Sequence, residues 1–285
     1  MIHLPVMAKE AIEHLNVRKG KWYVDCTLGA GGHSREILKR GGKVLGIDQD
    51  EEILVLAKKG LSDYQKRIVF EKGNFRQVGE AIKKHKIKEV FGVLYDLGLS
   101  SYQIEQDIRG FSFQREGPLD MRMDLSKSLK CADIINRGRE EELARILREY
   151  GEERMNRRIA REIVRNRPLR TTIELASLVA RVYGRRGKIH PATRTFQALR
   201  IAVNDELVAL TESLDSIFPY LASNGRIVVI SFHSLEDRIV KRKFKEWQKE
   251  EVFRVLTKKP LRPTPEEVQM NPRARSAKLR GGEKV

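Results

Sequence analysis

The sequence predicts an α/β protein with a doubly wound, mostly parallel β-sheet and an inserted all-α segment. Over the first hundred residues, short apolar runs alternate with stretches of helical periodicity. From Ala132 to about Asn204 nearly every segment has the spacing of an amphipathic helix, after which the α/β pattern returns. We therefore expect an α/β domain made of 1–106 and 205–285, and a helical domain made of 107–204.

Four apolar runs in the first hundred residues are typical of buried strands, and helical segments separate them. The expected strands are 21–26, 43–48, 67–70 and 90–96, and the expected helices are 33–40, 50–59 and 75–85. Strands joined by helices of this length need right-handed crossovers, which produce a parallel sheet with helices on both faces.

The insertion begins with a polar loop at 107–131, which contains glycine and proline. Its pattern matches neither the periodicity of a helix nor that of a strand. Helices follow, and Thr171 with Glu174 has the spacing of a capping box that opens one of them. The α/β pattern resumes with a helix through Leu207 and Ile217. The last expected elements are a turn at 224–225, a strand at 226–231, a helix at 235–249, and a hairpin pair at 252–257 and 274–279.

The charge balance favours a polyanionic partner. The 285 residues carry 56 Lys and Arg against 39 Asp and Glu, a formal net charge of +17. Residues 137–200 alone hold sixteen Arg and one Lys against eight acidic residues, a net of +9. A solvated surface of the thermophilic kind explains many charges, but it does not explain an excess of one sign. We expect the basic insertion to bind RNA through its phosphates.

Other features exclude several classes of protein. Cys26 and Cys131 form no C-x-x-C pair, so neither a disulfide framework nor a thiolate zinc site is expected, and no metal is required. No apolar run approaches the roughly 18 residues of a membrane span, and the N-terminus lacks the layout of a signal peptide. We therefore expect a cytoplasmic protein with no membrane partner. The sequence leaves a homodimer open.

A glycine-rich turn is the strongest functional signal. The pattern Asp25-x-x-x-Gly29-x-Gly31-Gly32 follows the first strand and opens a helix, where a ligand can approach a backbone without Cβ atoms. Asp48 ends the next strand 19 residues after Gly29, at a place where an acid can accept both hydroxyls of a ribose. Together they predict a nucleoside cofactor.

The choice of cofactor falls between a dinucleotide and S-adenosyl-L-methionine (SAM). A dinucleotide fingerprint requires Gly or Ala where this chain has Ser34. Asp25 would repel a pyrophosphate, whereas its charge suits the amino group or the sulfonium of SAM. SAM is therefore favoured, and an NAD(P)-dependent oxidoreductase is the alternative.

Three more residues are candidates for the same edge of the sheet. Asp96 ends the fourth strand, where open α/β sheets place ligands, although it is alternatively a helix cap. Phe75 follows the third strand and either stacks on an adenine or belongs to the core. Gln103 is a potential hydrogen-bond partner of the cofactor.

Several stretches, in order along the chain, carry a resemblance to a known family: GAGGHS at 29–34, DLGLSS at 96–101, RGFSF at 109–113 with GPLDMRMD at 117–124, YGEE at 150–153, HPATRTFQA at 190–198, SFHSLEDR at 231–238 and NPRARS at 271–276. On these stretches the chain resembles the MraW/RsmH family, the bacterial small-subunit ribosomal RNA cytosine-N4 methyltransferases. The resemblance covers nearly the whole length.

The resemblance implies a class I SAM methyltransferase fold with a helical insertion after the fourth strand. It implies SAM contacts from Gly31, Gly32, His33, Asp48, Phe75, Asp96 and Gln103. It also implies a substrate, the N4 amine of a cytosine in the decoding region of 16S rRNA within the small ribosomal subunit. The alternatives are methylation of another RNA base and a ribosome-assembly factor with a vestigial SAM pocket.

The group that orients the amine is the open question of the catalytic site. The Asp/Asn-Pro-Pro-Tyr/Phe motif of many amino-methyltransferases is absent after the fourth strand. Asp96, Ser100 and His233 are the candidates, and His233 is alternatively a structural histidine. Phe111 and Phe113 either clamp an unstacked base or fix their loop to the core.

Overall fold

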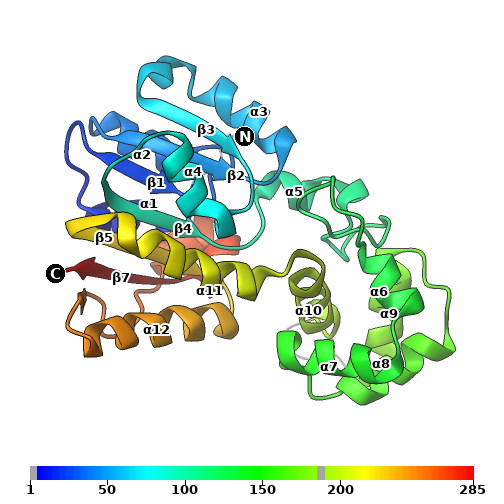
Figure 1. The fold of residues 1–285 in the computed structure, drawn as a ribbon. Coiled ribbons are helices and arrows are strands. Elements are labelled where there is room, and N and C mark those ends of the chain that lie inside the picture. Colours follow the sequence, from blue (N-terminus) through cyan, green and yellow to red (C-terminus); the bar gives the residue numbers. More distant parts are fainter. Residues whose placement is uncertain (1–4, 185–189) are drawn as a thin grey trace. The chain divides into compact units, whose positions relative to one another are not determined.

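The structure is a computed structural model that describes residues 5–184 and 190–285 (Figure 1). The chain forms two compact units, which are described separately below. The first consists of Met1–Gly98 with Leu207–Val285, and the second of Leu99–Glu206. The second unit contains the whole range 107–204 expected for the insertion and extends beyond it at both ends.

The first unit is built on one seven-stranded sheet in the order β3-β2-β1-β4-β5-β7-β6. Pairing is parallel from β3 to β5, while β7 is antiparallel to both β5 and β6. The strands are β1 (Trp22–Asp25), β2 (Lys43–Asp48), β3 (Ile68–Lys72), β4 (Val90–Asp96), β5 (Leu221–Ser231), β6 (Phe253–Val255) and β7 (Lys278–Lys284). The predicted doubly wound, mostly parallel sheet is confirmed.

Helices cover both faces of this sheet because successive side chains of each strand enter opposite cores. Val24 belongs to one apolar core and its neighbour Tyr23 to the other. The first core is closed by α4 (Val78–Lys84), α11 (Glu206–Ile217) and α12 (Ser234–Lys249). The second is closed by α1 (Ala8–Leu15), α2 (Gly32–Lys39) and α3 (Glu51–Gly60), as Figure 1 shows.

The end of the chain differs from the prediction in two places. The expected turn at Asn224 lies inside β5, where a left-handed residue (φ 60°) accompanies a shift of the β4–β5 register. The expected hairpin pair is present as β6 and β7, but its second strand begins later than predicted, at Lys278, because Pro272–Ser276 forms a 3-10 helix. A short helix, α13 (Pro265–Met270), lies in the proline-rich connection.

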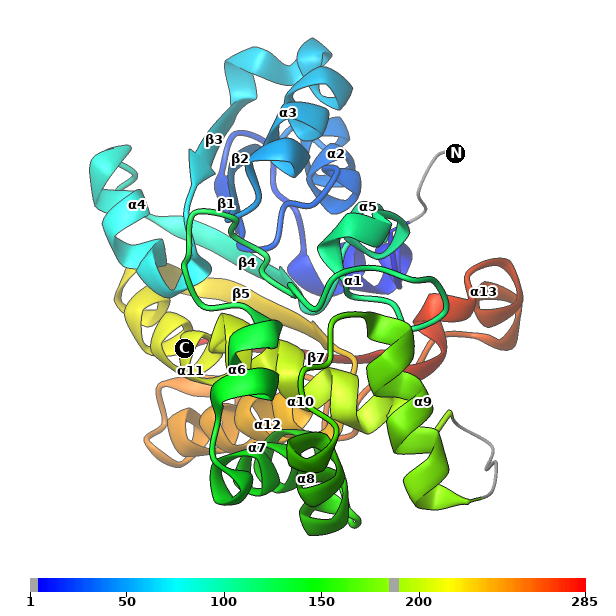
Figure 2. The same cartoon turned by 90° about the vertical axis from the view of Figure 1, so that its right-hand side faces the viewer.

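The second unit packs its helices around a separate apolar core (Figure 2). The helices around this core are α6 (Cys131–Arg137), α7 (Glu140–Gly151), α8 (Asn156–Arg165), α9 (Thr172–Tyr183) and α10 (Ala192–Asn204), and α5 (Ser101–Glu105) precedes them in the chain. The predicted capping box is present, since the side chain of Thr171 accepts from Glu174 N–H and the side chain of Glu174 accepts from Thr171 N–H. In both units, no helix among the described residues is long and apolar enough to span a membrane.

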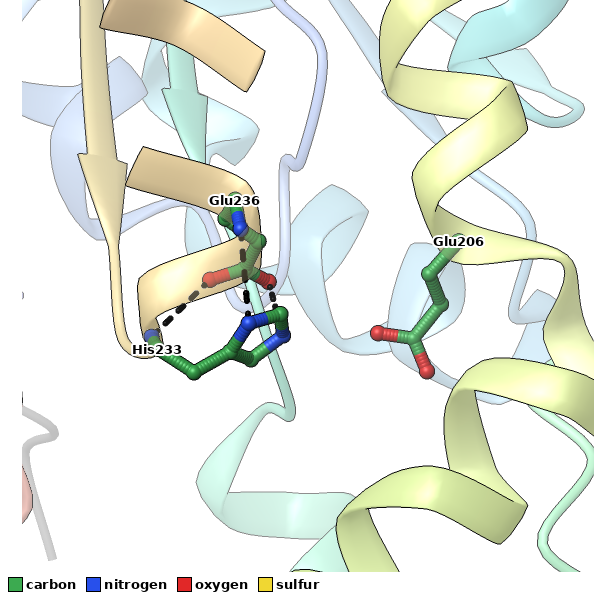
Figure 3. A group of neighbouring side chains, drawn as sticks. All are labelled: Glu206, His233 and Glu236. Carbon is green, nitrogen blue, oxygen red and sulfur yellow. Dashed lines mark hydrogen bonds and ion pairs between the residues drawn. The ribbon is translucent and has the colours of Figure 1, made fainter. Parts of the chain in front are cut away.

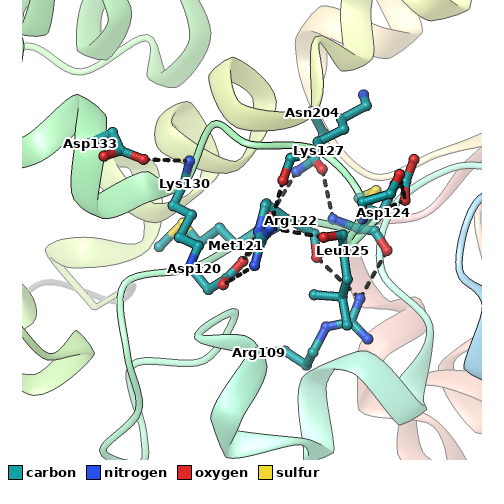
Figure 4. Close-up of polar contacts among 12 residues, drawn as sticks. Arg109, Asp120, Met121, Arg122, Asp124, Leu125, Lys127, Lys130, Asp133 and Asn204 are labelled. Atoms are coloured by element: carbon teal, nitrogen blue, oxygen red, sulfur yellow. Dashed lines mark hydrogen bonds and ion pairs between the residues drawn. The ribbon is translucent and has the colours of Figure 1, made fainter.

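Side chains hold together the irregular loop between α5 and α6 (Figure 4). The buried guanidinium of Arg109 donates to the carbonyls of Arg122 and Met123. The buried amide of Asn204 donates to the carbonyl of Met121 (2.8 Å) and accepts from Met123 N–H (2.8 Å). Because this loop lacks the backbone ladders of a helix or sheet, these side chains satisfy groups that would otherwise be buried without partners.

Replacement of Asn204 by alanine tests this account. Asn204→Ala removes the hydrogen bonds that the side chain makes to a buried carbonyl and a buried N–H, so we expect a loss of about 2 kcal/mol in the free energy of unfolding. Urea titration followed by circular dichroism measures it. The matched control is Asn166→Ala, which removes one hydrogen bond of an exposed asparagine to Glu162 O. A loss no larger than that of the control would contradict the role assigned to Asn204.

Candidate functional site

Three acidic residues lie at the carboxyl ends of neighbouring parallel strands. Asp25 ends β1, Asp48 ends β2 and Asp96 ends β4. β1 pairs with both other strands, and Asp25 is in register with Gly46 and Leu94. Asp48 and Asp96 therefore each extend two residues beyond Asp25, on either side of it. Parallel strands end at the same edge of the sheet, so the fold gathers three carboxylates that are far apart in the sequence.

The glycine-rich turn crosses this edge between β1 and α2. Leu28 N–H donates to Ile47 O (2.9 Å), and Gly31 N–H closes the turn onto Leu28 O (2.8 Å). Gly29 N–H donates to the carboxylate of Asp48 at 2.9 Å. The two features that the sequence linked only by their spacing are thus in direct contact.

The glycines of the turn are required for different reasons. Gly31 has φ +83°, and a Cβ there would lie 2.6 Å from Leu61 Cδ1. A Cβ on Gly32 would lie 3.1 Å from Pro5 Cβ. Gly29 has φ +53°, but the nearest atom to its Cβ position is Thr27 O at 3.8 Å. The protein's own packing therefore explains Gly31 and Gly32, whereas Gly29 faces space that a ligand can enter.

Asp48 is held by backbone donors on both oxygens. Besides Gly29 N–H, it accepts from Asp50 N–H at 3.0 Å. Burial raises the pKa of its carboxyl to about 6, although these two hydrogen bonds act in the opposite direction. Each carboxylate oxygen has a second lone pair, so the group can still accept ligand hydroxyls.

His33 and Asp96 form a close pair at the start of α2. His33 Nε2 lies 3.4 Å from Asp96 Oδ2, and the His33 side chain is buried. Burial lowers the pKa of His33, but the Asp96 carboxylate outweighs it and the net shift is upward. Asp96 is oriented from its backbone, since its N–H donates to Thr27 Oγ1 at 2.6 Å. Within the described residues, His33 Nδ1 and Asp96 Oδ1 are buried without a hydrogen-bond partner.

Asp25 has a structural role that the sequence did not reveal. Its carboxylate is buried and accepts from the Ser34 hydroxyl at 2.7 Å and from Thr27 N–H at 3.3 Å. Burial raises the pKa of Asp25, and the nearby His33 offsets part of that shift. Ser34, which departs from the dinucleotide pattern, is therefore the residue that fixes Asp25. The sequence alone does not predict this hydrogen bond, because Asp25 and Ser34 are nine residues apart and meet only through the conformation of the turn.

Phe75 follows β3, whose last residue, Lys72, is in register with Asp48. Its ring meets Tyr95 edge to face, with centroids 5.9 Å apart. The ring is half-buried, so part of it belongs to the core and part is open to contact. The contact with Tyr95 agrees with the core interpretation of Phe75, and its contact with an adenine stays a prediction.

Ser100 and Gln103 belong to the second unit. They form a capping box at α5: Ser100 Oγ accepts from Gln103 N–H, and Gln103 Oε1 accepts from Ser100 N–H, both at 3.2 Å. The Ser100 hydroxyl therefore caps the N-terminus of α5.

His233 caps the start of α12 (Figure 3). Its Nδ1 accepts from Glu236 N–H at 3.4 Å, and its Nε2 lies 3.1 Å from Glu236 Oε1. The other oxygen, Glu236 Oε2, accepts from Phe232 N–H at 2.8 Å. Because Asp96 is in register with Ile230, His233 follows β5 at the carboxyl edge of the sheet. The structural interpretation of this histidine describes its contacts well.

The edge of the first unit suits a nucleoside that carries a positive charge. Asp48 offers acceptor capacity for hydroxyl groups, Gly29 leaves room beside the backbone, and Phe75 offers part of an aromatic ring. Asp96 adds an unsatisfied carboxylate oxygen, and carboxylates raised in pKa by burial are stabilised by a cation. These are the properties that SAM requires of a binding site.

Comparison with known proteins gives matches over the whole chain. A family model described as the MraW methylase family matches residues 1–285. The ribosomal RNA small subunit methyltransferase H of Thermotoga neapolitana is 51% identical over 99% of this chain and 96% of that protein. Its counterpart from Carboxydothermus hydrogenoformans is 48% identical, over 99% and 98%. Among solved structures, an rRNA methylase from Streptococcus thermophilus is 12% identical with a TM-score of 0.49, covering 100% of this chain and 99% of that one.

Alanine at two glycines of the turn separates packing from ligand access. Gly31→Ala adds left-handed strain and a contact with Leu61, so we expect a loss of about 2 to 4 kcal/mol in the free energy of unfolding. Gly29→Ala, the matched control, adds the strain alone, about 1 kcal/mol. Chemical denaturation of the ligand-free protein measures both. Equal losses would show that Leu61 does not restrict the turn.

Proposed function

The chain belongs to the MraW methylase family, and we propose that it transfers a methyl group from SAM to the N4 amine of a cytosine in the decoding region of 16S rRNA. The observation that carries the cofactor half is the sheet edge, where Asp48 and Asp96 flank a glycine turn with open space at Gly29. The family resemblance implies the acceptor half, and the basic insertion supports an RNA substrate.

Each residue of the edge has a role in holding SAM. Asp48 accepts the hydroxyls of the ribose, and Phe75 contacts the adenine with the open part of its ring. Gly31 and Gly32 shape the turn, and His33 faces the ligand with its unsatisfied Nδ1. Gln103 is the contact that the family resemblance adds. When bound, SAM supplies a methyl group made electrophilic by the adjacent sulfonium.

Asp96 is the best of the three candidates for orienting the amine. The lone pair of the cytosine N4 amine is delocalised into the ring, so an acceptor must align the amine. Asp96 Oδ1 is available for this, because no described residue bonds to it. It accepts one N–H of the amine and afterwards takes the released proton, while His33 Nε2 lies 3.4 Å from the other oxygen, Oδ2. Ser100 and His233 are weaker candidates, because both already cap helices.

Methylation of small ribosomal subunits that lack this modification tests the proposal. We expect radiolabel from SAM in 16S rRNA, at a single cytosine when the modified nucleotide is mapped. Asp96→Asn, which no longer accepts the proton, should lower the rate at least 100-fold. Label on another base would refute the cytosine assignment. SAM binding without any label in rRNA would instead favour the assembly factor.

The raised pKa of Asp48 predicts how SAM affinity depends on pH. Above pH 6 the carboxylate is ionised and accepts the ribose hydroxyls fully, and below pH 6 it becomes protonated and loses part of that capacity. Affinity should therefore fall as the pH decreases through about 6.

Calorimetric titration with SAM between pH 5 and pH 8 measures this dependence. Asp48→Asn should bind SAM more weakly at pH 8 and lack the decrease near pH 6. Asp63→Asn, at an exposed aspartate of the same unit, is the matched control and should behave like the wild type. An unchanged pH profile in Asp48→Asn would remove Asp48 from the cofactor site.

A further inference from the structure

The second unit contains a cavity of about 580 Å³ along one face of α9. Ile173, Ala176 and Ala180 line it at the spacing of one helical face, while the opposite face of α9 is buried in the apolar core. The two alanines leave room where longer side chains would fill the space. Its volume falls within the range of about 300 to 1,000 Å³ that is typical of small-ligand sites.

Aromatic rings form another part of the lining. Phe113 stacks on His190, with ring centroids 4.6 Å apart and an angle of 24° between the planes. Phe196 holds Phe113 from the side in an edge-to-face contact at 5.0 Å. Of the two phenylalanines that the sequence offered as a clamp, Phe111 lies in the apolar core, while Phe113 lines the cavity. The cavity therefore presents rigid, flat surfaces, of the kind on which a planar ligand stacks.

The polar groups at the cavity can donate hydrogen bonds, and none of the described lining residues is acidic. They are the Ser177 hydroxyl, the Arg181 guanidinium and the His190 ring. His190 Nδ1 accepts from Ala192 N–H at 3.2 Å, which leaves the proton of the neutral ring on Nε2. Arg181 is exposed and forms no ion pair with any described residue. Such a lining favours a ligand with acceptor atoms and nearby negative charge.

The second unit, which contains the cavity, has the charge of an RNA-binding domain. Residues 137–200 carry a net charge of +9. On the segment leading into α8 and on α8 itself, Arg154, Arg157 and Arg158 are exposed, and no ion pair among the described residues neutralises them. A peptide segment would fill an apolar groove equally well, but the strongly basic second unit, with Arg181 at the cavity, matches a phosphate backbone.

We propose that this cavity binds an unpaired base of the rRNA substrate, which stacks beside the Phe113–His190 pair while Arg181 contacts the adjoining phosphate. Proteins that recognise single-stranded RNA commonly hold splayed-out bases in this way. The bound base is an anchor and is not the one that is methylated, because none of the lining residues that the structure describes has a carboxylate to accept a proton from an amine. The inference deepens the proposed function and rests on it.

A side chain that fills the cavity tests the proposal. Ala180→Phe projects a ring into the space from α9, and Ala180→Ser is the matched control that leaves it open. Filter binding with protein-free 16S rRNA should show about tenfold weaker affinity for Ala180→Phe, the effect of losing one stacked base, and no change for Ala180→Ser. The SAM-induced rise in melting temperature should be the same in both variants and in the wild type, since the first unit is untouched.

Arg181→Gln is the second variant, and Arg181→Lys is its control. Loss of the phosphate contact should weaken rRNA binding and reduce its dependence on salt in the glutamine variant alone. These variants keep the test decisive should Ala180→Phe fail to fold, which its melting temperature would reveal.

The outcomes separate this inference from the proposed function. Weaker rRNA binding by Ala180→Phe supports the base site even when the wild type methylates nothing, a result that would defeat only the proposed function. Wild-type affinity in both Ala180→Phe and Arg181→Gln would overturn the base site. Loss of binding to intact subunits, but not to protein-free rRNA, would also overturn it, because the cavity would then hold part of a ribosomal protein.

Discussion

The hydrogen bond from Gly29 N–H to Asp48 is the interaction on which the candidate site depends. It ties the turn after β1 to the end of β2, and it forms only because the two strands are parallel neighbours in the sheet. Leu28 N–H to Ile47 O reinforces the same connection. The turn is thereby held at the carboxyl edge with Gly29 facing open space, and α2 starts from it with His33 close to Asp96.

This arrangement has an electrostatic cost. Three strand-terminal carboxylates share one edge, and burial raises the pKa of Asp25 and Asp48. The protein offsets part of the cost with hydrogen bonds from backbone N–H groups and from Ser34, and with the proximity of His33 to Asp96. A cationic ligand offsets more of it. Because the carboxylates of this edge are poorly solvated, the edge favours the cationic SAM over an anionic dinucleotide.

In the second unit, side-chain hydrogen bonds give an irregular segment a defined conformation. The loop before α6 has few backbone partners of its own, so Arg109 and Asn204 bond to its carbonyl and N–H groups. Two of the stretches that carry the family resemblance, 109–113 and 117–124, lie in this loop. The same loop carries Phe113 to the cavity beside α9, so its internal hydrogen bonds also support the proposed RNA site.

The doubly wound sheet, the helical insertion and the glycine turn with Asp48 could all be predicted from the order of the amino acids. The spacing of apolar residues, the positions of glycines and the net charge can be read directly from the sequence. None of them requires knowledge of which residues are close together in space. The folded chain was needed to show why position 31 must be glycine, that Ser34 fixes Asp25, and that His233 caps a helix. It also revealed the cavity lined by Phe113 and α9. Each of these is a contact between side chains or between separated segments, and such contacts exist only once the strands and helices have packed.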